Sequence, residues 1–353
     1  MAGTRSAYQG CLLGLAVGDA MGFPVDDMKW RAIREDYGPN GLMGFDIAND
    51  SADVTSHTQL CAFTANGLLL GSTQERLQGR MAPYVRYIAL SQKEWANVQR
   101  RSSNLQRTYC WVYWVDQFRS RHCADNRMLD TLALERIGSL EDPINRLDGP
   151  CSLTAAVAVG MFAPQYDRLG AEAVALTCGD PTAFVCGALV ANLISTFLAE
   201  PDTAPMEVIR RAMESINLQF SHDYPQTWTV LHTLRQAVEL ALAGGNRQAH
   251  MESLVCENAA QVLAGAVYTL LTCEDDFDTA MITAVNHSGR SCAVAALAGA
   301  MLGARLGKES VPEFYLESLE VCQPLMTLAE DLYNGCPDPM DLDWDRKYLQ
   351  GER

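Results

Sequence analysis

Glycines occupy every fourth position near the start of the chain, in the stretch GCLLGLAVGDAMG that covers residues 10–22. This spacing places Gly10, Gly14, Gly18 and Gly22 on one face of a helix, which Pro24 then ends. Each glycine costs a helix about 1 kcal/mol relative to alanine. A stripe of four glycines therefore predicts that another backbone, or a ligand, comes very close to this helix.

Apolar residues at helical spacing recur along the chain, whereas strand patterns are weak. Beyond the first helix we predict helices over 28–36, 56–70, 82–101, 107–120, 126–138, 152–162, 170–177, 181–199, 204–217, 226–243, 250–273, 277–285, 291–306 and 312–334. The spans 181–199, 258–272 and 292–304 are apolar nearly all round, which is typical of interior helices. The first of these is long enough to cross a membrane. Polar residues such as Asn192 interrupt it, so we assign it to a buried core.

The pattern predicts a single all-α domain. We find no linker, repeat or low-complexity tract, and the breaks between helices are short Gly- and Pro-containing turns. The sequence therefore predicts one large helical bundle over residues 1–335, followed by a short polar C-terminal tail over residues 336–353.

Charge and cysteine usage narrow the classes of function. The net charge of −16 disfavours nucleic acid and anionic membranes as partners. It favours a basic protein partner, or it simply keeps the protein soluble. The N-terminus MAGTRSAYQG has no signal-peptide pattern, and the 12 cysteines have no metal-type spacing. We therefore expect a cytoplasmic protein with reduced thiols.

Two polar loops each open onto a small-residue helix and are predicted to line one cleft. The loop residues that we select are Thr55, Ser56, His57 and Thr58 in the first, and Ser288, Gly289, Arg290, Ser291 and Cys292 in the second. Ser and Thr are ordinary N-cap residues, while a helix N-terminus also attracts anions. Asp19 and Asp26, at the end of the glycine-rich helix, either hold a loop, hold a substrate hydroxyl or cap a helix. These residues alone do not name a reaction.

The order of four motifs resembles the ADP-ribosylglycohydrolase family. These motifs are GCLLGLAVGDAMGFPVDD, SHTQLCAFTANGLL, TCGDP and SGRSCAVAALAGAMLGARLG, and they span roughly residues 8–307. The resemblance implies an all-α orthogonal bundle with two magnesium ions in a central cleft. In that family, the ions and nearby acidic residues position ADP-ribose and water for cleavage of an N- or O-glycosidic bond.

The sequence departs from the family at both metal motifs. Where the family has Thr-Asp-Asp-Thr, this chain has Thr55-Ser56-His57-Thr58. Where the family has Gly-Asp-x-Asp-Thr, this chain has Gly289-Arg290-Ser291-Cys292-Ala293. All four aspartates are missing, and magnesium prefers oxygen ligands that carry carboxylate charge. We therefore expect no metal and no cofactor.

Other family positions have also changed. Thr-His-Gly-Asp-Pro appears as 177–181, with Cys178 in place of histidine, and the ribose-side Gly-Asn-Gly-x-x-Met-Arg aligns with 149–155 without its Asn, second Gly and Arg. Asp19 and Asp26 survive, and Asp26 matches a position near the scissile bond. Asp50 and Asp53 are the other carboxylates that could reach the cleft from a loop.

Coordinated loss at both motifs predicts a catalytically inactive member of the family that acts by binding. One specific version is an immunity protein that occludes a basic ADP-ribosyltransferase toxin. A second hypothesis is a metal-free hydrolase in which Arg290 anchors phosphate, His57 acts as a general base, and Asp26 or Asp19 orients water or ribose. A third is a sensor of ADP-ribose or a related nucleotide, and a fourth is a purely structural role.

Overall fold

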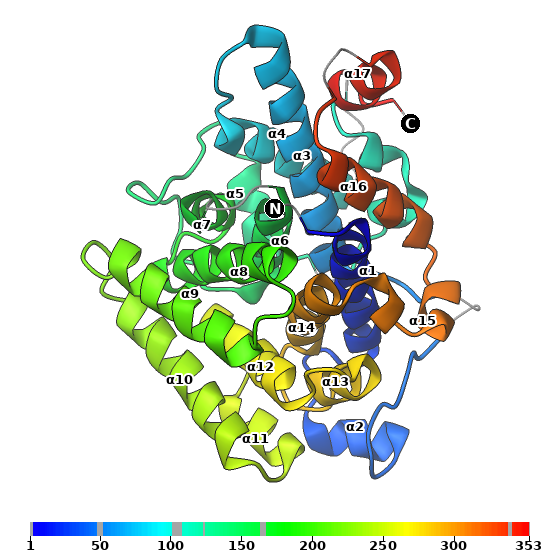
Figure 1. Cartoon of the computed structure of the whole chain (residues 1–353), viewed down its shortest axis with the longest axis vertical. Coiled ribbons are helices and arrows are strands. Elements are labelled where there is room, and N and C mark those ends of the chain that lie inside the picture. Colours follow the sequence, from blue (N-terminus) through cyan, green and yellow to red (C-terminus); the bar gives the residue numbers. More distant parts are fainter. Residues whose placement is uncertain are drawn as a thin grey trace.

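The computed structural model describes residues 3–47, 52–100, 108–122, 124–162, 167–337 and 341–352. Every regular element in these ranges is helical, as the sequence predicts (Figure 1). The α-helices are α1 Arg5–Gly22, α2 Trp30–Tyr37, α3 Ser56–Gln78, α4 Tyr84–Gln99, α5 Asn126–Leu132, α6 Leu153–Phe162, α7 Asp167–Ala175, α8 Pro181–Ala199, α9 Pro205–Phe220, α10 Thr227–Ala243, α11 Arg247–Leu254, α12 Ala259–Thr272, α13 Phe277–Val285, α14 Ser291–Leu306, α15 Glu313–Glu317, α16 Cys322–Asn334 and α17 Leu342–Leu349. Short 3-10 helices are η1 Phe23–Val25, η2 Trp111–Trp114, η3 Asp116–Arg119, η4 Pro150–Ser152 and η5 Lys308–Ser310.

The glycine stripe of α1 lies directly against the backbone of α14. A Cβ atom built on Gly10, Gly14 or Gly18 would lie only 2.4, 2.2 or 2.0 Å from a carbonyl oxygen of α14. The contact is reciprocal, because a Cβ on Gly299 or Gly303 would meet carbonyl oxygens of α1 at 2.0 and 1.9 Å. The predicted close approach is thus to another backbone. The two helices lie antiparallel and side by side along their lengths, and α16 covers α1 on another side (Figure 1).

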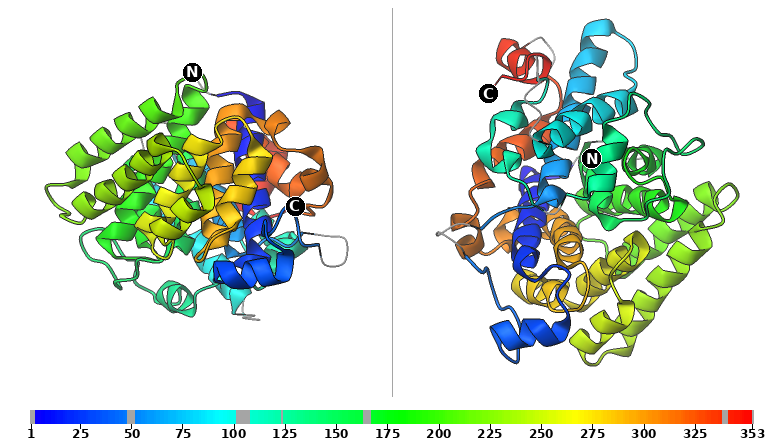
Figure 2. Two further views of the ribbon diagram at one scale, coloured as in Figure 1. Left: turned by 90° about the horizontal axis from the view of Figure 1, so that it is seen from below. Right: turned by 180° about the vertical axis from the view of Figure 1, so that it is seen from behind.

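Helix α8 spans the predicted residues and lies inside the fold. Pro181 stands at its first turn, and the Asp180 carboxylate accepts a hydrogen bond from the Thr182 N–H at 2.8 Å, so this end is capped. In the described part of the chain, α8 is the one helix long and apolar enough to cross a membrane, but most of it is buried by neighbouring helices. Helices α6, α7, α9 and α12 pack around it, as the two further views show (Figure 2).

Several predicted helices are shorter or divided. The range 250–273 contains α11 and α12, because Val255 and Cys256 have positive φ angles of 67° and 53° that no helix continues through. Helix α12 then restarts with a capping box between Asn258 and Gln261. In the range 107–120, the described residues 108–120 form η2 and η3 in place of an α-helix, and 312–334 contains α15 and α16.

The segment after residue 335, which the sequence assigns to a polar tail, contains helix α17. Trp344 and Tyr348, one turn apart, are buried, and α17 packs on α3. The indole N–H of Trp344 donates to Thr73 Oγ1 at 2.8 Å, and Arg76 of α3 forms an ion pair with Asp345. The segment therefore adds a helix to the bundle.

Candidate functional site

The start of α3 is held by a carboxylate from the end of α1. Asp19 is fully buried and accepts four hydrogen bonds, from the backbone N–H and the hydroxyl of both Thr55 and Thr58. The two hydroxyl bonds are 2.6 Å long, which is typical of a charge-assisted contact. The Asp19 carboxylate therefore caps the N-terminus of α3, and both of its oxygens are occupied by hydrogen bonds from Thr55 and Thr58.

Asp26 holds the start of α14 in a similar way. Its Oδ1 accepts the backbone N–H of Cys292 at 3.1 Å, at the N-terminus of the helix. Burial raises the pKa of the Asp26 carboxyl, although His57, the Cys292 N–H and Arg290 each favour its charged form. Cys292 itself is buried.

Arg290 points back toward the loop that follows α1. Its guanidinium lies 2.9 Å from an Asp27 oxygen and 3.7 Å from an Asp26 oxygen. Partial burial opposes the charge of Arg290, but the two carboxylates outweigh it and raise its pKa. The cation that the sequence places in this cleft is thus paired within the chain.

His57 lies between these two helix starts. It is only 2% exposed, and its Nε2 atom is 4.0 Å from the Sγ atom of Cys151 in η4. Its Nδ1 atom is buried and has no hydrogen-bond partner among the residues that the structure describes. His57 interacts electrostatically with Asp26, so imidazole, carboxylate and thiol form one cluster. We call His57, Cys151, Asp26, Asp27 and Arg290 the junction cluster.

The remaining residues of the second polar loop fix its path. Ser288 Oγ accepts the Trp30 N–H at 2.8 Å and donates to Glu252 at 3.0 Å, while Ser291 Oγ donates to the Val285 carbonyl at 3.0 Å. Gly289 has a φ of 147°, and a Cβ there would lie 2.7 Å from the Val255 carbonyl oxygen, so only glycine fits.

The first polar loop is also largely structural. Ser56 is buried and its backbone N–H donates to the His122 carbonyl at 3.1 Å. The nearby Asp53 side chain is 57% exposed and lies 3.7 Å from His122. Asp50 lies outside the described residues. The structure thus assembles both loops around the end of α1 and uses most of their polar groups internally.

Two further family motifs lie close by. Cys178 is buried, and burial raises the pKa of its thiol to about 11. The 149–155 segment forms η4 and the start of α6, and it brings Cys151 to His57. Sequence reasoning overlooked Cys151, because its contact with His57 joins residues 94 positions apart. It also overlooked Asp27 as a partner of Arg290, although adjacent carboxylates in FPVDD were a usable signal.

The two magnesium ions that the family resemblance implies do not fit these side chains. Both oxygens of Asp19 already accept hydrogen bonds, and Asp26 and Asp27 face Arg290. Within the part of the chain that the structure describes, no three His, Cys, Asp or Glu side chains are grouped so as to hold a metal ion. Serine, histidine, arginine and cysteine stand where carboxylates would be needed.

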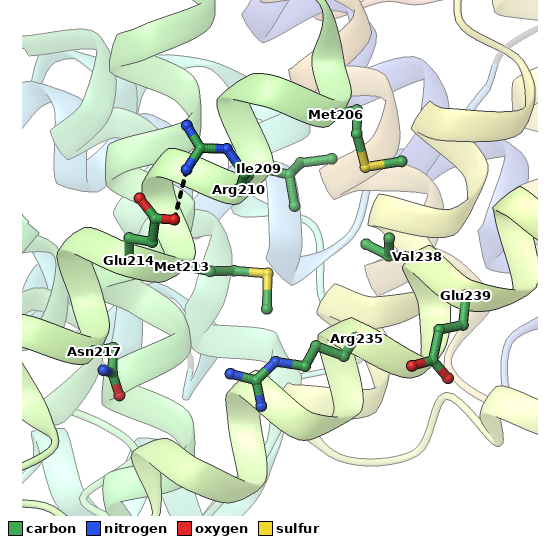
Figure 3. A pocket seen from close by; sticks show the side chains of 9 residues that line it. All are labelled: Met206, Ile209, Arg210, Met213, Glu214, Asn217, Arg235, Val238 and Glu239. Carbon is green, nitrogen blue, oxygen red and sulfur yellow. Dashed lines mark hydrogen bonds and ion pairs between the residues drawn. The ribbon is translucent and has the colours of Figure 1, made fainter.

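A separate hollow of about 370 Å³ is lined by residues of α9 and α10 (Figure 3). Its floor is apolar and is formed by Met206, Ile209, Met213 and Val238. Charged side chains surround it, and Arg210 is held by Glu214, as the dashed line in the figure shows. Two carboxylates, Glu214 and Glu239, are among the residues that line the hollow, and none of its lining residues belongs to the junction cluster.

The described residues form an all-helical protein in which two carboxylates, at the end of α1 and just after it, bind the N-termini of two other helices. Asp19 accepts hydrogen bonds at the start of α3, and Asp26 accepts one at the start of α14. The family model described as ADP-ribosylglycohydrolase matches residues 1–341, and the chain belongs to this family. Among solved structures, the chain is similar to one described as an "ADP-ribosylglycohydrolase-related protein complex". The TM-score is 0.63 at 20% identity, over 94% of this chain and 98% of that one, which establishes the shared fold. A search of curated proteins gives no match.

Proposed function

We propose that this chain is an ADP-ribosylglycohydrolase-fold protein that lacks the magnesium-dependent hydrolysis of its family and acts by binding. The observation that carries the proposal is the use of the carboxylates at the two helix starts. Asp19 is saturated by four hydrogen bonds, and Asp26 and Asp27 neutralise Arg290. A dinuclear magnesium centre needs several carboxylates free to coordinate the ions.

The partner that we propose is a protein with a basic surface. The net charge of −16 favours such a partner and speeds its association. The similar structure is described as a protein complex, which gives a precedent for assembly on this fold. The specific version is an immunity-type protein that occludes an ADP-ribosyltransferase toxin.

The first experiment measures release of ADP-ribose from ADP-ribosyl-arginine and ADP-ribosyl-serine substrates, with magnesium and with chelator. An active family member serves as the positive control. We expect no release in either condition. Magnesium-dependent release would contradict the proposal and would direct mutagenesis to Asp50 and Asp53.

Release that persists in chelator would instead support the metal-free hydrolase. In that case Arg290→Gln and His57→Gln should each abolish it, because the metal-free mechanism assigns phosphate binding and general-base roles to these side chains.

The proposed binding of a basic protein partner is tested by affinity purification from the native source at low and high salt. Recovery of no stoichiometric protein partner would count against it.

A further inference from the structure

Helix α10 carries an exposed stripe along one side. The stripe consists of Trp228, His232, Arg235, Glu239 and Leu242, each three or four residues from the next along the helix. Trp228 is 66% exposed and Leu242 is 72% exposed, although both are large apolar side chains. We call these five residues the α10 stripe. Large apolar groups at both ends of an exposed stripe favour contact with another protein surface.

The two rings at the start of the stripe are held in place. The Trp228 indole and the His232 imidazole stack, with ring centroids 5.1 Å apart and planes only 3° apart. A ring that is already ordered loses little conformational freedom when a partner covers it. Tryptophan is also enriched among the residues that dominate the binding energy of protein–protein interfaces. The stack of Trp228 on His232 is therefore suited to contact with a second surface.

The two charges at the centre of the stripe are available to a partner. On the neighbouring helix α9, Arg210 is paired with Glu214 (Figure 3). Among the described residues, neither Arg235 nor Glu239 takes part in an ion pair, and no dashed line joins them in the figure. A cation and an anion about one turn apart on α10 are thus both free to meet opposite charges on another chain.

The surface around the stripe carries no net charge. Helices α9 and α10 together contain three acidic and three basic side chains, which are Glu207, Glu214, Glu239, Arg210, Arg211 and Arg235. The whole chain, by contrast, has a net charge of −16. A balanced surface does not select a basic partner, and it allows two copies of an acidic chain to meet without local repulsion.

The order of charges along the stripe is complementary to itself. When two copies of a helix pack antiparallel about a two-fold axis, residues equally far from the axis on opposite sides face each other. With the axis beside Ala237, Arg235 of each copy faces Glu239 of the other. The same register places His232 opposite Leu242 of the second copy, so the ring stack covers that leucine. A parallel pairing would instead bring like charges together.

We propose that two copies of this chain associate through the α10 stripe, packed antiparallel about a two-fold axis beside Ala237. Two Arg235–Glu239 ion pairs lie at the centre, and the ring stack of each copy covers Leu242 of the other. Arg235 and Glu239 also line the hollow formed with α9, so the second helix covers part of its apolar floor. Burial of this apolar surface supplies the attraction, and the ion pairs fix the register.

This association goes beyond the binding function proposed above and does not depend on it. Self-association is measured on the purified protein alone, whereas a basic partner is sought in the native source. A monomeric chain would leave the proposed basic partner intact, and failure to find that partner would leave the proposed dimer intact.

The test is sedimentation velocity of the full-length native protein at physiological salt, at concentrations up to about 100 μM. We expect a monomer–dimer equilibrium. Arg235→Glu and Glu239→Arg should each weaken the dimer about tenfold or more, because like charges then face each other. Leu242→Ala should weaken it as well, because the ring stack loses its apolar contact. Arg34→Glu, at an exposed position of α2, is the matched control and should leave the dimer unchanged.

Exchange of the two charges distinguishes this pairing from any other interface. The double variant Arg235→Glu/Glu239→Arg restores opposite charges at the facing positions and should dimerise as the native protein does. An equal mixture of the two single variants should form a heterodimer, because one copy then carries two acidic groups and the other carries two basic groups at these positions.

A native protein that stays monomeric over the whole concentration range would overturn the proposal. A dimer that is unchanged by either single charge reversal would also overturn it, and so would a double variant and a mixture that both fail to dimerise. The substituted side chains are all exposed, so the variants are expected to fold, and circular dichroism checks this.

Discussion

Asp19 uses both of its carboxylate oxygens for hydrogen bonds within the protein. Its two oxygens accept four hydrogen bonds from Thr55 and Thr58, and no part of the side chain is exposed. The hydroxyls that remain in the first polar loop thus serve the helix start and this carboxylate. Motif comparison alone cannot distinguish this role from substrate binding, because both use the same residue types.

Asp19→Asn is expected to destabilise the protein by about 3 kcal/mol, because the amide would point an N–H group at buried donors. Urea unfolding followed by circular dichroism measures the change. Asp202→Asn, at an exposed turn, is the control and should change stability by less than about 0.5 kcal/mol. Equal stability of the two variants would show that the four bonds are not structural.

His287 gives the folded state a pH dependence. Burial lowers the pKa of this histidine, which is fully buried beside the second polar loop. The unfolded chain therefore binds this proton more readily than the folded chain. The stabilising contribution is complete above the unfolded pKa of about 6.5 and is lost as pH falls toward the folded pKa.

We expect the free energy of unfolding to fall more steeply in the native protein than in His287→Gln as the pH drops below about 6.5. Glutamine keeps an N–H that can donate to the Ala284 carbonyl, which His287 Nε2 contacts at 3.0 Å. Urea titrations at several pH values measure the difference in slope. Identical slopes would mean that His287 does not titrate with unfolding.

At the scale of elements, the contact between α1 and α14 requires glycine. Gly18→Ala should cost about 3 kcal/mol or prevent folding, because the added Cβ would lie 2.0 Å from the Ala295 carbonyl oxygen. Gly44→Ala is the matched control, since a Cβ there meets no atom within 4 Å. Thermal unfolding compares the two variants. A Gly18→Ala protein as stable as Gly44→Ala would show that the helices can separate at low cost.

Helix α17 belongs to the folded unit and is expected to stabilise α3. Trp344→Ala should reduce stability by about 3 kcal/mol, because it removes a buried indole and leaves Thr73 without the indole hydrogen bond. Leu342→Ala, at a side chain that is 65% exposed, is the control in the same helix. Denaturant unfolding gives both values, and similar effects would mean that α17 packs only loosely.

Some elements could be read from the sequence and others could not, for identifiable reasons. Helix α8 begins and ends as predicted because Asp180 and Pro181 mark its start. The break between α11 and α12 was missed because it rests on the backbone angles of Val255 and Cys256, two residues that normally continue an apolar pattern. Helix α17 was missed because its two buried aromatics stand among charged residues.

The candidate site shows the same division. The two polar loops were identified because each precedes a small-residue helix, and Asp19 and Asp26 were identified with them. Their hydrogen-bond partners, and the contact of Cys151 with His57, are tertiary and leave no local pattern. Family comparison supplied the positions of the missing aspartates, whereas only the fold shows what the substituted residues contact.

At the scale of the whole molecule, magnesium should not stabilise the protein. A ligand that binds only the folded state raises the melting temperature, so we expect a shift below about 1 °C at millimolar magnesium. The positive control is the combined variant Ser56→Asp, His57→Asp, Arg290→Asp and Cys292→Asp, which restores the family's aspartates. A chelator-reversible increase in the native protein would contradict the proposed function.

The pairing of α1 with α14 also constrains how the chain can be made. The glycine face of Arg5–Gly22 packs against Ser291–Leu306, so the ribosome must release all the helices between them before this pair can form. Until then the apolar helix α1 lacks the helix that covers its glycine face. Such long-range closure slows folding and favours dependence on chaperones during synthesis. Fragments that end before α14 should accordingly be insoluble or short-lived in the cell.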